Sequence, residues 1–296
     1  MGETIMGRFR GMRFSGGAST RWGNDSLVIA SNLLIIKVPS ILISVVEPLM
    51  AMLQEQGMAS LHLVGGEKGG VGKSFTARLL AQYFIDKQQP FIGFDSDQSH
   101  GTFSRFYQEF ASPINTHSFD SLDRIVETAE QKPDQNIIVD LAAQTFSSLN
   151  KWIDESEILA LMGELGFRVY VWHVMDDGAD SLTLLGKTLQ SFNPDQVQLV
   201  VVENHGRGED FDLIDGSGIF AEAKELGAHT MVLSKLQSSL VKKIDFSDSS
   251  FWAAANNTDL MSTVERHRVR AWLNKNYLQI DTILTYEAND TLAPAY

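Results

Sequence analysis

Short apolar runs alternate with longer amphipathic stretches from residue 59 of this 296-residue chain onward. The runs are rich in Val, Ile or Phe, and most have no polar alternation, which is typical of strands covered on both faces. The stretches between them have the periodicity of helices. Strands that alternate with helices imply right-handed crossovers, so we predict an α/β fold with a mainly parallel sheet and helices on both faces.

The apolar runs give the positions of the strands, and the amphipathic stretches give the helices. We predict strands at 61–64, 91–94, 136–139, 168–173, 197–202 and 230–233. We predict helices at 74–87, 121–131, 146–163, 181–191, 219–226 and 259–277. Ligands in such sheets bind beyond the carboxyl ends of the strands, so the residues that directly follow the strands are the candidates for a site.

The first 57 residues differ from the rest, because arginines precede an apolar run from Leu27 to Leu53. A basic start followed by an apolar segment resembles a signal peptide or a membrane anchor. However, Lys37 and Pro39 interrupt the run, and the uninterrupted pieces are shorter than the roughly 20 residues of a spanning helix. An extension outside the core, a segment that associates with a membrane and an extra packed helix are the three interpretations, and we favour the first.

Composition and charge limit what the chain can do. The 44% of hydrophobic residues can fill a sizeable core, and we predict an extension at 1–57, a core domain at 58–280 and a tail at 281–296. The net charge of −13 disfavours generic attraction to nucleic acid or an anionic membrane, although a basic cluster at 266–275 leaves DNA contact open. The absence of cysteine excludes disulfides and thiolate zinc sites and is compatible with a reducing cytoplasm, where we place the protein.

A glycine-rich segment, GGEKGGVGKS, follows the first core strand and leads directly into a helix. Glycines let the backbone curl so that successive N–H groups cradle phosphate oxygens, and the helix N-terminus adds its positive dipole. Lys73 is placed to bridge the β- and γ-phosphates of a nucleotide, and the Ser74 hydroxyl to bind Mg²⁺. The predicted nucleotide-binding residues here are Gly69, Gly70, Val71, Gly72, Lys73, Ser74 and Phe75.

Carboxylates end the next two strands. Asp95 and Asp97 are one residue apart, so their side chains point to the same side of an extended chain and could both face the phosphates. Asp140 ends an apolar run, where a carboxylate usually has a cation or a hydrogen-bond partner because an unpaired buried charge is costly. We predict Ser74, Asp95 and Asp140 as magnesium residues. Capping of the following helix is the alternative for Asp95 and Asp97.

The run Lys-Gly-Gly-Val-Gly-Lys-Ser resembles the deviant Walker A motif of the MinD/ParA superfamily of ATPases, and residues 95–98 resemble that family's Asp-x-Asp-Pro-Gln segment without its proline. The resemblance implies a slow, partner-stimulated ATPase that forms a homodimer on binding ATP and Mg²⁺. It implies three catalytic residues: Lys68, which reaches the partner subunit's phosphates, Lys73, and Asp97, which orients the attacking water. It also implies that Asn204 hydrogen-bonds adenine, although an asparagine there is by default turn chemistry.

Besides the missing proline, the sequence departs from the family pattern at three further places. Glu67 replaces the first glycine of the phosphate loop, and the usual Asp-x-Pro segment becomes residues 140–144, Asp-Leu-Ala-Ala-Gln. Phe75 replaces a hydroxyl residue, so an α-phosphate contact there would depend on its backbone N–H alone.

Within the superfamily, residues 58–280 are most similar to conjugal-transfer proteins of the TraL type. The resemblance implies an ATP-dependent dimerisation switch that serves plasmid conjugal transfer or mobilisation with an unidentified protein partner. A ParA-like DNA partition ATPase and a nucleotide-gated scaffold with little hydrolysis are the alternatives. A membrane role is disfavoured, except through residues 27–53.

Overall fold

The computed structural model describes residues 27–31, 34–38, 58–97 and 101–285. The chain divides by its contacts into two units, residues 1–57 and Met58–Tyr296.

In the first unit, β1 (Leu27–Ser31) pairs antiparallel with β2 (Leu34–Val38). These parts of the apolar run are therefore strands and not the extra helix considered above. The rest of that run lies outside the described residues. Among the residues that the structure describes, no helix is long and apolar enough to cross a membrane.

The second unit is built on a parallel sheet of seven strands, which confirms the predicted α/β class. In sequence order the strands are β3 (Ser60–Gly65), β4 (Phe91–Asp95), β5 (Ala111–Pro113), β6 (Asn136–Asp140), β7 (Arg168–Met175), β8 (Gln198–Asn204) and β9 (His229–Leu233). Their order across the sheet is β5-β4-β6-β3-β7-β8-β9, and each pair of neighbours is parallel. All the carboxyl ends therefore meet at one edge, with β3 near the middle.

The register of the central strands brings the predicted acidic residues together. Asp140 at the end of β6 lies opposite Val64 of β3 on one side and opposite Asp95 of β4 on the other. The chain leaves β3 at Gly65 and enters the glycine-rich loop directly. Both carboxylates consequently lie beside the start of that loop.

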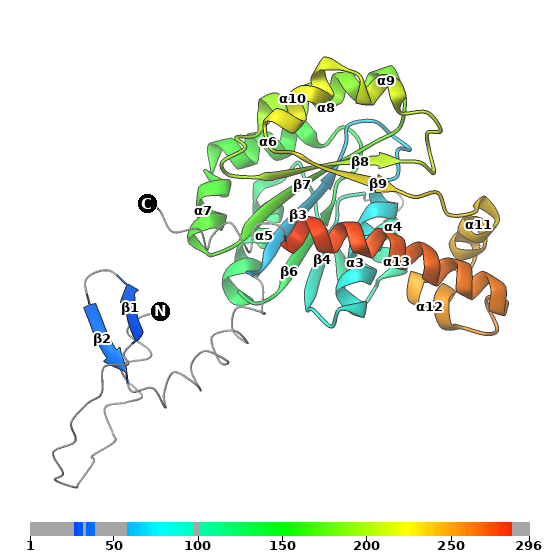
Figure 1. Cartoon of the computed structure of the whole chain (residues 1–296), viewed down its shortest axis with the longest axis horizontal. Helices are drawn as coiled ribbons and strands as arrows, with labels where there is room; N and C mark the ends of the chain where they lie inside the picture. The colour runs from blue at the N-terminus through cyan, green and yellow to red at the C-terminus, as the bar shows by residue number, and fades with distance from the viewer. Residues whose placement is uncertain (1–26, 32–33, 39–57, 98–100, 286–296) are drawn as a thin grey trace, which may run out of the picture. The chain divides into compact units, whose positions relative to one another are not determined.

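Helices cover both faces of the sheet (Figure 1). One face carries α3 (Lys73–Asp86), α4 (Thr102–Phe106), α11 (Ser238–Phe246), α12 (Phe251–Asn256) and α13 (Thr263–Thr285). The other face carries α5 (Phe119–Gln131), α6 (Phe146–Glu155), α7 (Ile158–Glu164), α8 (Ala179–Ser191), α9 (Asp212–Asp215) and α10 (Gly218–Glu225). Side chains of β3 alternate between the faces: Leu61 and Leu63 enter one core cluster and Val64 enters the other.

The observed helices correct two predictions. The single helix predicted at 146–163 is divided into α6 and α7 at Glu157, which adopts a left-handed conformation with φ 49°. The helix predicted at 259–277 begins instead at Thr263, because Ser262 and Glu265 form reciprocal capping hydrogen bonds, and it extends to Thr285, into the predicted tail. The sequence interpretation also missed β5, α4, α9, α11 and α12.

Candidate functional site

The loop between β3 and α3 has the backbone that the glycines predicted. Gly66, Gly70 and Gly72 have φ values of 133°, 79° and 107°, a region that side chains other than glycine rarely adopt. A Cβ on Gly66 would lie 2.5 Å from the Val174 carbonyl oxygen, and one on Gly72 would meet the Asn204 amide. Gly72 also precedes α3 with no side-chain cap, so the loop leads into an uncapped helix N-terminus.

Lys73, the first residue of α3, points back into this loop. Its ammonium donates a hydrogen bond to the Lys68 carbonyl oxygen at 2.8 Å, and the residue is buried. Burial lowers the pKa of Lys73, and the negative charges of Asp140, Glu67 and Asp97 oppose that effect. The ammonium therefore lies in the glycine-rich loop, where the negative charges of three carboxylates act on it.

Asp140 is the most unusual group in the site. It is 2% exposed, and neither carboxylate oxygen has a hydrogen-bond partner of good geometry among the described residues. Burial raises its pKa to about 7, the nearby Ser74 hydroxyl opposes this, and the charge of Asp95 adds to it. Ser74 and Asp140 are thus brought together as predicted, and an unpartnered buried carboxylate beside a hydroxyl fits a divalent cation.

The two aspartates at the carboxyl end of β4, Asp95 and Asp97, have different surroundings. Asp95 is buried and accepts backbone hydrogen bonds at both oxygens, from Asp97 at 3.0 Å and from Ser104 at 2.8 Å. Asp95 therefore fixes the backbone at Asp97 and in the first turn of α4. This is the role in capping the following helix that the sequence left open for Asp95. Asp97 lies close enough to Lys73 and Asp140 to influence both their pKa values, so it belongs to the site.

Lys68 is held within its own chain. Its ammonium lies 3.0 Å from the Asp176 carboxylate, and the two side chains are 30% and 19% exposed. Asp176 also accepts from the Ser181 hydroxyl at 2.6 Å and from the Gly178 backbone. Although burial raises the pKa of Asp176, the Ser181 and Lys68 hydrogen bonds hold it below its usual range. Sequence reasoning missed Asp176, although it directly follows a buried strand, which was the signal used for the other aspartates.

Two further residues that the sequence predicted to bind nucleotide, Asn204 and Phe75, contact other parts of the protein. The Asn204 side-chain amide donates to the Val71 carbonyl at 2.7 Å and accepts from the Gly206 N–H at 2.9 Å. It therefore connects the glycine-rich loop to the turn after β8. The Phe75 ring packs against Phe251 and Trp272, at centroid distances of 5.2 and 5.5 Å. The Phe75 side chain thus belongs to the core.

Glu67 was noted in the sequence only as a departure from the motif. Its carboxylate accepts a hydrogen bond from the Phe146 N–H, at the first residue of α6, at 3.0 Å. The phosphate loop is therefore joined to the helix that follows Asp140.

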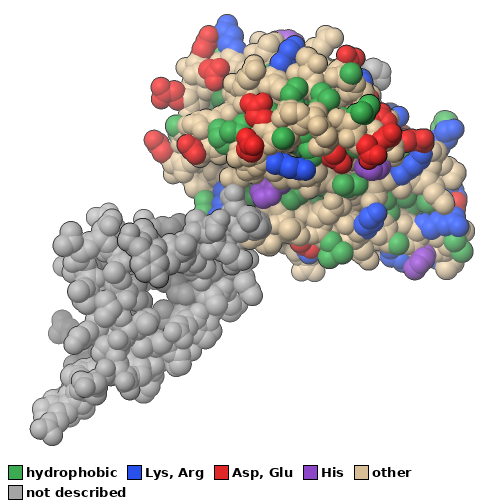
Figure 2. Space-filling view, turned by 45° about the horizontal axis from the view of Figure 1, so that its top comes forward, with side chains coloured by type: hydrophobic (Ala, Val, Ile, Leu, Met, Phe, Trp, Pro, Cys, Tyr) green, Lys and Arg blue, Asp and Glu red, His purple; other side chains and the backbone are tan. Residues whose placement is uncertain are grey.

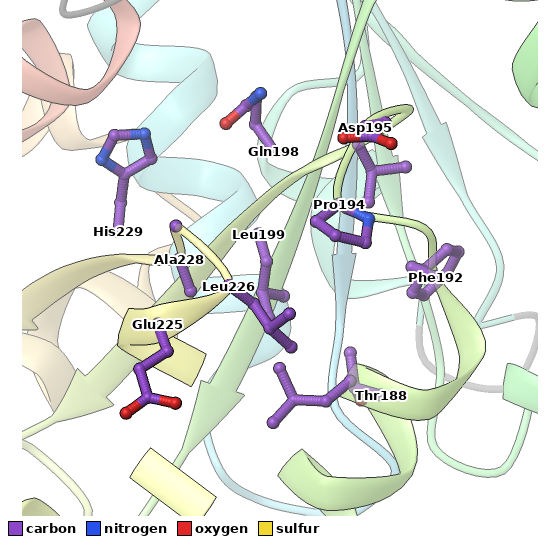
Figure 3. A pocket seen from close by; sticks show the side chains of 13 residues that line it. Thr188, Phe192, Pro194, Asp195, Gln198, Leu199, Glu225, Leu226, Ala228 and His229 are labelled. Carbon is purple, nitrogen blue, oxygen red and sulfur yellow. The ribbon is translucent and has the colours of Figure 1, made fainter. Parts of the chain in front are cut away.

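A separate cavity of about 440 Å³ lies far from this loop in the fold (Figure 3). Its lining includes Phe192, Asp195, Leu226 and His229, at the amino ends of β8 and β9. The phosphate loop follows the carboxyl end of a strand, so the two lie at opposite edges of the parallel sheet.

The parallel sheet, the glycine turn between β3 and α3, and the Lys73-Ser74 pair define the class: this is an α/β protein in which a glycine-rich loop joins a central strand to a helix that begins with Lys-Ser. In sequence, the chain is 25% identical to protein MobD of Acidithiobacillus ferrooxidans over 174 residues, covering 58% of this chain and 76% of MobD. It is 32% identical to protein TraL of Escherichia coli over 129 residues, covering 41% of this chain and 52% of TraL. The resemblance to TraL-type proteins is therefore confirmed, over about half of the TraL length.

Solved structures similar to this chain include the septum site-determining protein MinD complexed with Mg-ADP from Pyrococcus horikoshii, with a TM-score of 0.48 and 13% identity over 77% of this chain and 98% of that one. A ParA family ATPase from Chlorobium tepidum has a TM-score of 0.44 and 12% identity over 73% of this chain and 98% of that one. No family model matches the chain.

Proposed function

We propose that this chain binds ATP with Mg²⁺ at the loop between β3 and α3, hydrolyses it slowly, and dimerises in its ATP-bound form. The observation that carries the proposal is the buried Asp140 carboxylate, which has no hydrogen-bond partner of good geometry among the described residues, has the Ser74 hydroxyl nearby and feels the charge of Lys73. Such a group is costly unless a cation completes its surroundings. A nucleotide-bound Mg²⁺ supplies that cation.

The side chains of the site divide the work of phosphoryl transfer. Ser74 and Asp140 would hold the magnesium ion, which would neutralise charge on the transferring phosphoryl group. Lys73 would exchange its bond to the Lys68 carbonyl for the phosphates. Asp97 would orient the attacking water, with its charge already near Lys73. Asp95 supports this arrangement by holding the backbone of Asp97.

Dimerisation would complete the site. Lys68 has 30% of its side chain exposed and is paired with Asp176 of its own chain. To reach the phosphates of a partner subunit, it must leave Asp176. ATP binding would then favour the dimer by offering Lys68 a more highly charged anion.

The similar sequences support a proposal for the biological role. We propose service in plasmid conjugal transfer or mobilisation, with an unidentified protein partner, in the cytoplasm, and we propose residues 58–280 as the ATPase domain. TraL and MobD support this role as the similar sequences. A turnover rate that rises with DNA would favour the partition alternative. ATP-dependent dimerisation with negligible turnover would favour the scaffold alternative.

The first test removes the ammonium of Lys73. In Lys73→Ala, ATP turnover should fall by about 10²-fold or more, because the group stabilises developing phosphate charge. Lys151→Ala is the matched control, because Lys151 lies on the exposed surface of α6 with 64% of its side chain accessible. Steady-state phosphate release and binding of a fluorescent ATP analogue measure the two variants. Unchanged binding and turnover in Lys73→Ala would overturn the proposed function.

A further inference from the structure

Glu67 reaches from the phosphate loop to the N-terminus of α6. The residue that precedes this helix, Thr145, makes no side-chain cap, because its hydroxyl donates instead to the Ala142 carbonyl at 2.8 Å. The Glu67 carboxylate accepts the Phe146 N–H in its place. A helix N-terminus normally takes its cap from the adjacent residue, whereas this one takes it from a residue 79 positions earlier in the chain.

The chain between Asp140 and α6 is fixed at both of its ends. We call residues 141–145 the switch segment. At its start, Leu141 donates to the Val64 carbonyl at 2.9 Å and Ala142 donates to the Ser96 hydroxyl at 2.7 Å. The helix after its end is held by Glu67. Glu67, the residue that replaces the first glycine of the family pattern, therefore holds the helix that follows the altered Asp-x-Pro segment.

The Glu67 carboxylate also belongs electrostatically to the phosphate site. It is one of the three negative charges that act on Lys73. A triphosphate bound there would bring further negative charge toward Glu67 and would engage the ammonium that now faces it. Both changes disfavour the carboxylate in its present position, and the terminal phosphate, which a diphosphate lacks, has the larger effect.

We propose that Glu67 is a positioning residue that makes the first turn of α6 respond to the terminal phosphate of the nucleotide. Without a triphosphate, Glu67 holds the Phe146 N–H. With one bound, the carboxylate is displaced and the switch segment and first turn of α6 are released. This inference rests on the proposed ATP site and adds the route by which that site acts on α6. A cap without this role would hold α6 equally in every nucleotide state.

Hydrogen exchange at the Phe146 amide distinguishes the two cases in the unaltered full-length chain. We expect exchange about tenfold faster with a non-hydrolysable ATP analogue and Mg²⁺ than with ADP and Mg²⁺ or with no nucleotide. The Ser121 amide of α5, whose N–H donates to the hydroxyl oxygen of the N-cap residue Ser118, is the internal reference and should not change. Equal Phe146 exchange in all three states, with the analogue shown to be bound, would overturn the inference and leave the ATP site standing.

Two variants distinguish the effect of the Glu67 charge from the effect of its side-chain length. Glu67→Gln keeps the side-chain length and an acceptor oxygen, so the Phe146 amide should stay protected without nucleotide but lose its response to the analogue. Glu67→Asp keeps the charge but is one methylene shorter, so the amide should exchange quickly in every state. A Glu67→Gln variant that responds like the unaltered chain would overturn the role of the charge. Failure of the unaltered chain to bind any nucleotide would overturn the proposed function and this inference together.

Discussion

At the residue scale, the site is organised by charges placed where solvent cannot relieve them. Asp140 is buried without a hydrogen-bond partner of good geometry among the described residues, and Lys73 is buried among carboxylates. Asp140 would be more stable with a bound cation than without one, because the cation supplies the opposite charge that the carboxylate lacks. Burial of the Asp140 carboxylate therefore lowers the free energy of unfolding when no ligand is bound. This effect can be measured as a dependence of that free energy on pH.

We expect the protein without ligand to lose stability as the pH rises from about 4 to about 7. Burial raises the pKa of Asp140 to about 7, so the folded state keeps this proton to a higher pH than the unfolded state does. The stabilisation that Asp140 contributes is fully present below its pKa in the unfolded state. It is lost as the pH rises through its pKa in the folded state. The contribution is on the order of 4 kcal/mol at most.

Urea unfolding of the unaltered chain and of Asp140→Asn at pH 5 and pH 8, without nucleotide or Mg²⁺, measures this contribution. The variant cannot ionise at this position, so its advantage over the unaltered chain should grow toward pH 8. Asp259→Asn, at an exposed position, is the control and should show no such trend. An equal difference between Asp140→Asn and the unaltered chain at both pH values would contradict the expectation.

At the scale of elements, the helix that starts at the phosphate loop is tied to its neighbours through Arg78. This side chain of α3 is only 2% exposed, and its guanidinium lies 3.5 Å from the centroid of the Phe106 ring at the end of α4. It also donates to Asp245 of α11 at 3.0 Å. Two of its nitrogens have no hydrogen-bond partner among the described residues. The packing of α3 against α4 and α11 therefore depends on one buried cation.

Arg78→Ala should destabilise the fold by about 3 kcal/mol, because it removes a buried side chain that packs on aromatic rings and leaves a cavity in its place, whereas Asp245, with 48% of its side chain exposed, can be solvated. Arg105→Ala is a matched control, since Arg105 also pairs with an aspartate, Asp248, but both side chains are about half exposed. An exposed pair of this kind contributes at most about 1 kcal/mol. Chemical denaturation of both variants compares them, and equal losses would contradict a special role for the buried cation.

The sequence predicted the central strands closely but predicted the helices less well. β4 and β6 contain continuous apolar runs, and β3 is interrupted only by the buried His62; burial on both faces makes such runs recognisable. The break at Glu157 and the short helices α11 and α12 depend on local turns that leave no periodic signal. Element boundaries were therefore less predictable than the order of strands and helices.

In the candidate site, too, some features were predictable from the sequence and others were not. The loop residues and Asp140 were predictable because a contiguous motif and a strand end place them. The contacts of Lys68 with Asp176 and of Glu67 with Phe146 join residues 108 and 79 positions apart, so no local pattern could predict them. Asn204 was predicted to hydrogen-bond adenine and is found bracing the loop, because its partners come from β3–α3 and from its own turn.

At the scale of the whole molecule, electrostatics governs how two copies would meet. The chain carries a net charge of −13, and red acidic side chains are spread over the visible face of the described core in Figure 2. Two such molecules repel each other at low ionic strength. Close approach therefore needs local compensation, and the proposed exchange of Lys68 from Asp176 to a partner's phosphates supplies it.

This exchange predicts that weakening the ion pair within one chain strengthens the dimer. In Asp176→Asn, the side chain can still accept from Ser181 and Gly178, but it no longer carries the charge that holds Lys68. Lys68 is then available to the partner at a lower cost, so ATP-dependent dimerisation should strengthen about fivefold to tenfold, the equivalent of about 1 to 1.4 kcal/mol for a charge-assisted hydrogen bond at a partly exposed site. Sedimentation velocity with a non-hydrolysable ATP analogue measures the association.

Ser181→Ala controls for the loss of loop structure, because it removes a hydrogen bond to Asp176 without removing the charge that faces Lys68. The double variant Lys68→Ala with Asp176→Asn should lose the gain, since the ammonium that benefits is absent. If Asp176→Asn dimerised no better than the unaltered chain, or if the gain persisted without Lys68, the ion pair would not restrain dimerisation. The cost of closing the dimer would then lie in the repulsion between the two acidic surfaces, and raising the salt concentration, rather than changing Asp176, would strengthen association.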